Sequence, residues 1–462
     1  MIRISTLEGR PVSFVGFQVL FLMLLFSVFL QGFFIENAMR TSEELRENPV
    51  NPVNLARIIL IGFVGLCLIG VFLLRSSQFT RNFKGPLGWM IVYAAIALAS
   101  AAYSSLPLVS AGKAFEVLVD VLFFVAVSSF CTSLEVNSLW DLLLFFLSAY
   151  LTAVWISALV MPSVGFIHIP GALLPLQLQG AYPTNSPNDI GEISAIVAAT
   201  AFYRLLLKRR SAIENEGLLW GGILVLGIVS LIFAQARTSV IELAAALIAI
   251  LLMTRKSRLL PLLLVSGAIL FVAGGASALR EYLMRGQSSE LFYSMSGRLS
   301  IWDVAWTFFK ESPLIGHGFF TAHRLDLNIR LTAISVNVST IDNTFLEVLL
   351  GVGLIGLLPI LAGLFQLASW LLRIARKAGL GGRMRECRCE IVGVLIIVII
   401  RAVNGPTFQG HSISLLILLI SMAFAHTALR VQVAKQRSRI QRSEFYRRLI
   451  VPSSDAQVST TS

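Results

Sequence analysis

Long apolar runs alternate with short polar segments along almost the whole chain. A run of about 20 apolar residues has the length that crosses a bilayer as a helix. A helix satisfies its own backbone hydrogen bonds, which lipid cannot do, so these runs predict transmembrane helices. We predict about twelve spans, at residues 12–34, 55–75, 86–103, 114–134, 139–161, 189–207, 217–235, 238–254, 259–279, 343–370, 391–403 and 411–430.

Composition fits this interpretation, because 56% of the 462 residues are hydrophobic and only 13% are charged. A soluble globular chain does not need so much apolar surface. We therefore expect an all-α integral membrane protein. Its parts are spans within 1–279, a long external loop at 280–342 between the ninth and tenth spans, further spans within 343–430, and a basic tail at 431–462. The four cysteines predict neither a disulfide framework nor a zinc site, and we expect no metal or other cofactor.

The net charge of +12 follows the predicted topology. With the N-terminus inside, most lysines and arginines fall in the inner segments and in the tail, which is the bias that orients membrane proteins. We therefore expect both termini inside. Contact with anionic lipid explains the basic tail. No fold that binds nucleic acid accompanies it, so we expect membrane lipid as a partner and no nucleic acid.

Polar side chains gather at the outer ends of several predicted spans and in the external loop. Guanidinium groups bind phosphate oxygens through paired hydrogen bonds. A carboxylate beside them can accept a proton from a sugar hydroxyl. This combination suits the transfer of a glycan from a lipid diphosphate. The residues concerned are Asn188, Asp189, Arg237, Arg298, Asp342, Asn343, Arg401 and His411.

These side chains also have purely structural explanations. An arginine at the end of a span, such as Arg237, can extend to the lipid headgroups, and Arg298 can be an ordinary exposed loop residue. Asp342 and Asn343 precede the tenth span and can cap its helix. The residues that follow, TFLE, fit a capping box.

Two other residues of the external loop can be explained in the same way. Trp302 lies four residues before Trp306, a spacing that suits an amphipathic helix in the outer interface. His317 stands between two glycines, which is typical of a turn. His317 and His323 are alternative bases if Asp342 is not one.

Four segments together resemble one family, the O-antigen ligases and the related polymerases of bacterial O-antigens and exopolysaccharides. RLSIWDVAWTFFKESPLIGHG resembles the family's Arg…Trp…Pro-x-x-Gly-x-Gly block, and AQARTS resembles its Ser/Ala-Arg-Thr turn. GAYPTNSPNDIG resembles its Gly…Asn-x-x-Gly segment, and IDNTFLEVLLGVGLIG resembles the ligase pattern that begins with His and ends with two glycines. The matched residues are Gly180, Asn188, Gly191, Arg237, Arg298, Trp302, Pro313, Gly316, Gly318, Asn343, Gly353 and Gly356.

The chain departs from the ligase pattern at one position, where Asp342 replaces the histidine. An unperturbed aspartate is a weaker base than a histidine. Asp342 is then either a base made stronger by its surroundings or a group that orients the acceptor hydroxyl. We take the replacement to favour a polymerase over a ligase.

The resemblance implies a GT-C-like fold in the bacterial inner membrane, with a site that faces the periplasm or exterior. It implies an inverting glycosyltransferase that polymerises oligosaccharides carried on undecaprenyl diphosphate, with a co-polymerase or chain-length regulator as a protein partner. Arg237, Arg298 and Asp342 are the expected catalytic residues, and the arginines take the place of a metal. The expected substrate-binding residues are Asn188, Trp302, His317, Asn343 and Arg401. The alternatives are an O-antigen-type ligase, a transporter of lipid-linked sugars and a non-catalytic scaffold.

Overall fold

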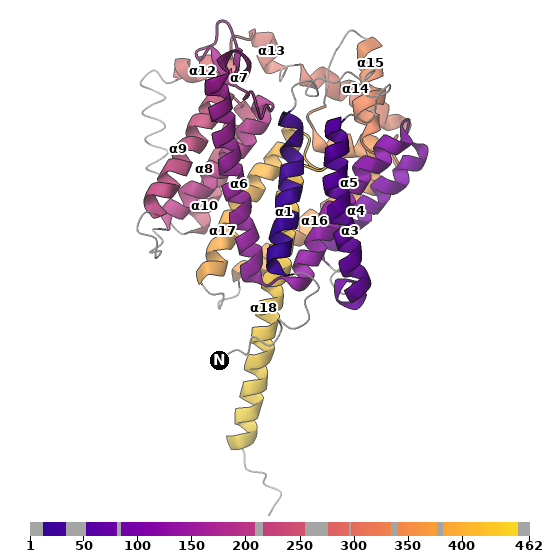
Figure 1. Ribbon diagram of the computed structural model, residues 1–462, viewed down its shortest axis with the longest axis vertical. Coiled ribbons are helices and arrows are strands. Elements are labelled where there is room, and N and C mark those ends of the chain that lie inside the picture. Colours follow the sequence, from indigo (N-terminus) through magenta and orange to yellow (C-terminus); the bar gives the residue numbers. More distant parts are fainter. Residues whose placement is uncertain are drawn as a thin grey trace, which may run out of the picture.

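The computed structural model describes residues 13–33, 52–80, 85–207, 216–254, 276–294, 297–333, 341–376 and 382–450. Long helices form a bundle, and shorter elements cover one of its ends (Figure 1). The predicted all-α architecture is confirmed over these residues, apart from one two-stranded hairpin.

The long helices are α1 (Phe14–Phe29), α3 (Pro52–Thr80), α4 (Pro86–Ala99), α5 (Pro107–Phe130), α6 (Ser133–Val160), α8 (Pro187–Leu206), α9 (Glu216–Ala234), α10 (Arg237–Met253), α16 (Thr344–Arg376), α17 (Gly382–Asn404) and α18 (Ile413–Ile450). Short 3-10 helices at Leu30–Phe33 and Ser100–Tyr103 extend α1 and α4. We call the elements at the end of the bundle the cap. They are α7 (Pro162–Gly165), β1 (Phe166–His168), β2 (Leu176–Leu178), α12 (Ala276–Met284), α13 (Ser289–Tyr293), α14 (Arg298–Glu311), the π-helical turn η5 (Ala322–Asp326) and α15 (Leu327–Ala333).

Six of the described helices are long and apolar enough to cross a membrane, and α1 is a shorter apolar helix. These helices indicate a membrane protein; twelve spans remain a prediction. A described helix lies over each predicted span except the ninth, of which 259–275 lie outside the described residues. Two helices are longer than predicted, since α17 begins at Gly382 and α18 continues to Ile450.

Large apolar side chains cover the outside of the bundle. Leu73 on α3, Leu218 on α9 and Phe365 on α16 are 75%, 79% and 78% exposed. Soluble monomers rarely expose so much apolar surface, whereas hydrocarbon covers it favourably. Inside the bundle, Phe21 and Phe123 are fully buried and stacked, with ring centroids 5.9 Å apart.

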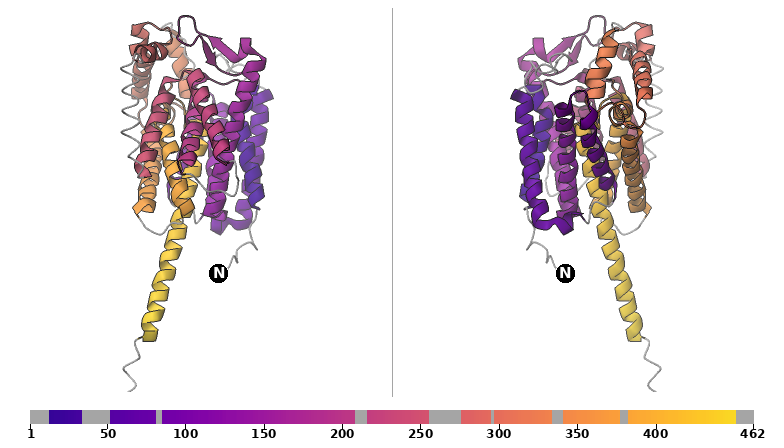
Figure 2. Two further views of the ribbon diagram at one scale, coloured as in Figure 1. Left: turned by 90° about the vertical axis from the view of Figure 1, so that its left-hand side faces the viewer. Right: turned by 90° about the vertical axis from the view of Figure 1, so that its right-hand side faces the viewer.

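The cap and the C-terminal extension of α18 lie at opposite ends of the bundle (Figures 1 and 2). The extension carries the basic sequence KQRSRIQRSEFYRR, which we expect to be cytoplasmic. The cap contains most of the predicted external loop. This arrangement fits the orientation predicted from charge, in which the polar cluster faces outward.

A loop of the cap, 313–318, docks into a break in α16. The helix is interrupted at Gly353, which has φ 63°. Just after the break, the backbone N–H of Leu354 donates to the Pro313 carbonyl at 2.9 Å. A Cβ at Gly353 would collide with the Leu314 carbonyl, so a side chain does not fit there.

The same loop also bonds to the turn of α16 before the break. The backbone N–H of His317 donates to the Leu350 carbonyl at 2.7 Å, and that of Gly318 donates to the Gly351 carbonyl at 2.9 Å. These bonds give the Pro-x-x-Gly-x-Gly segment a physical role. They fix the loop that follows α14 against α16, and so fix the starts of the two helices relative to each other.

Candidate functional site

Arg298 and Asp342 form an ion pair in the cap. Arg298 is the first residue of α14, and its Nη2 lies 2.6 Å from Oδ2 of Asp342, which immediately precedes the helix-capping residue of α16. The two side chains are 18% and 24% exposed. Trp302, one turn further along α14, donates its indole N–H to the Ile341 carbonyl at 2.9 Å. Trp302 therefore positions the backbone that carries Asp342.

Asn343, and not Asp342, caps α16. The Asn343 Oδ1 accepts the backbone N–H groups of Phe345 and Leu346, each at 3.1 Å. Asp342 has φ 51°, a left-handed conformation that asparagine and aspartate tolerate better than most residues. The structural explanation therefore holds for Asn343. The carboxylate of Asp342 points to Arg298 instead of to the helix.

The predicted capping box at the start of α16 does not form. The Thr344 hydroxyl donates to the Gly405 carbonyl at 2.6 Å and bonds to Thr407 at 2.7 Å. The Glu347 carboxylate is fully buried and has no hydrogen-bond partner within the described part of the chain. Thr344 thus ties the loop after α17 to the start of α16. At the end of α17, the Asn404 carbonyl accepts a hydrogen bond from Arg298 at 3.5 Å.

Arg237 and Arg285 lie in the same region and are held by neutral groups. Arg237 donates to Oε1 of Gln287 at 2.6 Å, and its guanidinium lies 4.9 Å from the centroid of the Phe292 ring. Arg285 donates to the Gln235 carbonyl at 3.3 Å. Over the residues that the structure describes, no carboxylate pairs with either arginine.

The charges of the three arginines act on one another. Arg237 begins α10 and lies just before the predicted span 238–254; burial and the positive charges of Arg285 and Arg298 lower its pKa to about 10. Burial and the charge of Arg298 also lower the pKa of Arg285. The structure thus brings Arg237, Arg285 and Arg298 together as a cationic cluster, with Asp342 beside it.

Arg401 lies in a network of carboxylates. Its side chain is 3% exposed, and its Nη2 lies 2.7 Å from Oδ1 of Asp189. Its Nε lies 3.3 Å from Oε2 of Glu192. The other oxygen of this carboxylate, Oε1, accepts a hydrogen bond from the Ser414 hydroxyl at 2.5 Å. Arg401 therefore joins α17 to α8, and its charge is already neutralised.

Asn188 and His317 are the two remaining predicted substrate-binding residues. Asn188 is half-buried in the first turn of α8, beside Asp189. His317 stacks on Phe308 with ring centroids 4.0 Å apart, and its Nε2 lies 3.1 Å from the Phe308 carbonyl. His317 therefore fastens the docking loop to α14.

Arg285 and Gln287 complete the surroundings of Arg237, and neither is predicted from the sequence. Both belong to the segment EYLMRGQSS, which shows no motif. Their only sequence signal is an arginine followed by glycine just after a short amphipathic stretch.

Comparison with known families identifies the part of the chain that holds this cluster. Residues 192–361 match the family model described as O-antigen ligase. This segment is therefore similar to an O-antigen ligase domain. The resemblance predicted from the four sequence segments is thereby confirmed. No curated protein matches the chain.

The O-antigen ligase domain contains all three arginines of the cluster and Asp342, whereas Arg401 lies beyond its C-terminal limit. The domain indicates an enzyme of the glycan ligase or polymerase type, which acts on lipid-linked oligosaccharide at a membrane. The geometry suits this chemistry: a cationic cluster can hold a diphosphate, and a carboxylate lies next to it.

Proposed function

We propose that the protein polymerises oligosaccharide repeat units carried on undecaprenyl diphosphate, at the outer face of the bacterial inner membrane. The observation that carries the proposal is the cationic cluster of Arg237, Arg285 and Arg298. Two of these arginines have neutral partners only, over the described residues. The third is paired with the one carboxylate that the reaction requires. Such a site attracts a multivalent anion and holds a proton acceptor beside it.

The reaction is a single displacement at the anomeric carbon of the donor glycan. The hydroxyl oxygen of the acceptor sugar, on a second lipid-linked unit, forms the new glycosidic bond. The bond between the anomeric carbon and the diphosphate oxygen breaks, and its electron pair leaves with the diphosphate. Asp342 accepts the hydroxyl proton, and the configuration at the anomeric carbon is inverted. Arg237, Arg285 and Arg298 stabilise the negative charge that develops on the leaving diphosphate, so this mechanism needs no metal.

The ion pair between Arg298 and Asp342 is the resting state of this site. A diphosphate that binds Arg298 competes with Asp342 for the guanidinium. Once Arg298 has turned to phosphate, the Asp342 carboxylate is a better hydrogen-bond acceptor for a sugar hydroxyl. Trp302 and the capping residue Asn343 hold the backbone on either side of Asp342, and neither takes part in the bond changes.

The test is the length of the polysaccharide made by cells that carry Arg298→Lys or Arg237→Ala. Lysine keeps a positive charge but lacks the planar pair of donors that grips phosphate. We expect both variants to accumulate single lipid-linked repeat units, while Lys310→Ala, an exposed residue of α14, makes normal polymer. Normal polymer length at normal protein level in Arg298→Lys and Arg237→Ala would remove the cluster from the mechanism.

The second candidate is a ligase, because the matching family model is described as O-antigen ligase. A ligase would move finished glycan from the carrier to a different acceptor through the same cluster. The two functions differ in the species that accumulates when the gene is deleted. Single repeat units on the carrier indicate a polymerase, and long polymer retained on the carrier indicates a ligase.

A further inference from the structure

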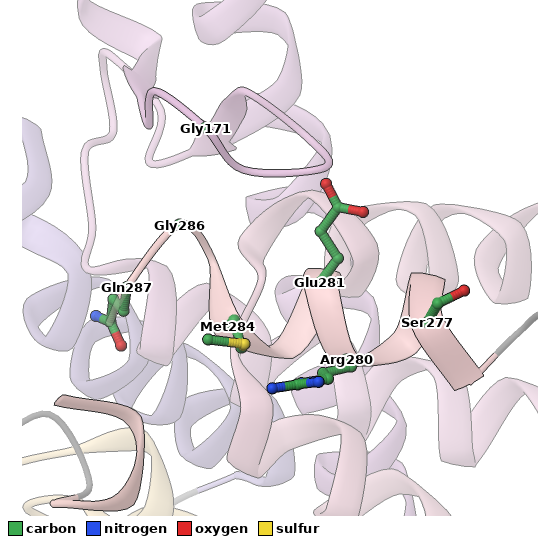
Figure 3. Close-up of a pocket in the computed structure, with 7 residues that line it drawn as sticks. All are labelled: Gly171, Ser277, Arg280, Glu281, Met284, Gly286 and Gln287. Carbon is green, nitrogen blue, oxygen red and sulfur yellow. The ribbon is translucent and has the colours of Figure 1, made fainter. Parts of the chain in front are cut away.

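A cavity of about 630 Å³ lies in the cap, between α12 and the turn of the β1–β2 hairpin (Figure 3). Its size is within the range of about 300–1,000 Å³ that is usual for small-molecule sites. Ser277, Arg280 and Glu281 line it from α12, Gly171 lines it from the hairpin turn, and Gln287 lines it from the segment after α12. The mechanism above makes no use of this cavity.

The hairpin is fastened to the turn between α9 and α10. Gln235 lies in this turn and donates its amide to the Leu174 and Leu176 carbonyls of the hairpin, at 3.0 and 3.1 Å. In the opposite direction, Gln177 of β2 donates to the Ala234 carbonyl at 2.8 Å. The hairpin wall of the cavity is therefore tied to the residues directly before Arg237.

The end of α12 meets the hairpin at Gly286. A Cβ at Gly286 would lie 2.8 Å from the Pro170 carbonyl oxygen, so the two segments are already in contact. Arg285 reaches back from the same place to the Gln235 carbonyl. Both walls of the cavity are thus joined to the α9–α10 turn, and the cavity is built into the fold of the cap.

The cavity adjoins the cationic cluster. Gln287 lines the cavity and accepts the hydrogen bond from Arg237 at 2.6 Å. Met284 also lines the cavity, and its carbonyl accepts from the same guanidinium nitrogen at 3.4 Å. A ligand with its diphosphate on Arg237 and Arg285 therefore has the cavity next to its phosphates.

The lining combines apolar surface with polar side chains that offer both donors and acceptors. It presents a hydroxyl, a guanidinium, a carboxylate and an amide, and Figure 3 shows Glu281 extending from α12 toward the Gly171 turn. Sugar rings, which carry hydroxyl groups on every side, match such a lining, whereas a polyprenyl chain would leave these groups unpaired. We propose that this cavity binds the sugars nearest the diphosphate of the donor glycan, an inference that rests on the proposed function.

The experiment measures the binding of two ligands to purified protein in nanodiscs. One ligand is undecaprenyl diphosphate, and the other is the carrier-linked oligosaccharide extracted from cells that lack the protein. We expect Arg280→Ala and Glu281→Ala each to weaken binding of the oligosaccharide about tenfold, as when a hydrogen bond to a charged group is lost. Binding of undecaprenyl diphosphate should not change in either variant. Lys310→Ala, which removes an exposed charge elsewhere in the cap, should change neither.

Failure of this inference and failure of the proposed function give different results. If oligosaccharide binding is the same in Arg280→Ala, Glu281→Ala and the unmodified protein, the sugars lie elsewhere and the cavity proposal is overturned. Equal weakening of both ligands by these variants would also overturn it, because the effect would then fall on the diphosphate. If Arg237→Ala weakens neither ligand, the proposed function itself fails.

Discussion

Replacing Asp342 with asparagine separates its structural role from its chemical role. Asparagine keeps an oxygen that can accept from Arg298 and fits the same left-handed backbone. The ion pair is partly exposed, with side chains 18% and 24% accessible, so its loss should cost about 1 kcal/mol of stability. That change lowers the Tm by a few degrees at most. Loss of the proton acceptor should lower the transfer rate by about 10²–10⁴-fold.

The same substitution should strengthen binding of the carrier diphosphate. Asp342 competes with phosphate for Arg298 in the resting state, and asparagine competes less because it has no charge. An ion pair worth up to about 1 kcal/mol corresponds to an increase in affinity of up to about fivefold. Asp342→Asn is therefore expected to bind undecaprenyl diphosphate more tightly and to turn over more slowly.

The matched comparison is Asn343→Ala, which removes the cap of α16. Loss of an N-cap costs about 1 kcal/mol, so the two variants should be destabilised to a similar extent. The assay is polymerisation of carrier-linked oligosaccharide by purified protein in nanodiscs, together with thermal unfolding and diphosphate binding. The reasoning is refuted if Asp342→Asn keeps its rate within a few-fold, or if Asn343→Ala loses as much rate at equal stability.

Three further variants test other parts of the arrangement. Arg285→Ala should lower the transfer rate by about 10²–10³-fold in the nanodisc assay at unchanged Tm, because a preorganised cation is lost. An unchanged rate would exclude Arg285 from the mechanism. Arg401→Ala leaves Glu192 as a buried unpaired carboxylate and should destabilise the protein by about 3–5 kcal/mol, measured as loss of folded protein in membranes. Adding Glu192→Gln should restore part of the lost stability. If it restores none, the pairing of Arg401 with Glu192 is contradicted. Gly353→Ala should release the docking loop from α16, because its Cβ collides with the Leu314 carbonyl; wild-type Tm and rate would show that the break in α16 is not required.

The hydrophobic pattern was sufficient to predict the helices of the bundle. It placed a helix over each predicted span whose residues the structure describes, because lipid allows few alternatives to a helix. It misplaced the ends of α17 and α18. The basic residues before Ile391 and after Arg430 mark the ends of apolar spans, but a helix continues through them. Hydropathy shows where a helix leaves the bilayer, but it does not show where the backbone hydrogen bonds of the helix end.

Several polar groups of the candidate site could be found in the sequence, but their partners could not. Arg237, Arg298 and Asp342 carried signals in the sequence, and the structure places them in one region. Asn343 and Arg401 could be identified by residue type, but their partners could not be predicted. Asn343 is used by its own helix, and Arg401 is used by the carboxylates of α8. Which polar group a side chain meets depends on helix packing, which one sequence does not specify.

The described arginines of the bundle differ from Arg237 and Arg285 in the groups that hold them. In the bundle, Arg57 pairs with Glu116 at 2.7 Å, and Arg204 pairs with Asp141 and Glu390 at 2.6 and 2.8 Å. A carboxylate both fixes a guanidinium and cancels its charge, which is what a buried structural arginine requires.

Arg237 and Arg285 are fixed differently, by an amide oxygen, backbone carbonyls and an aromatic face. Neutral acceptors hold a guanidinium in place and leave its charge intact, so the two cations and Arg298 repel one another. The fold maintains this unfavourable arrangement at the end of the bundle, beside the cavity between α12 and the hairpin. A bound dianion would relieve the repulsion, and this supports the proposal that the cluster holds a diphosphate.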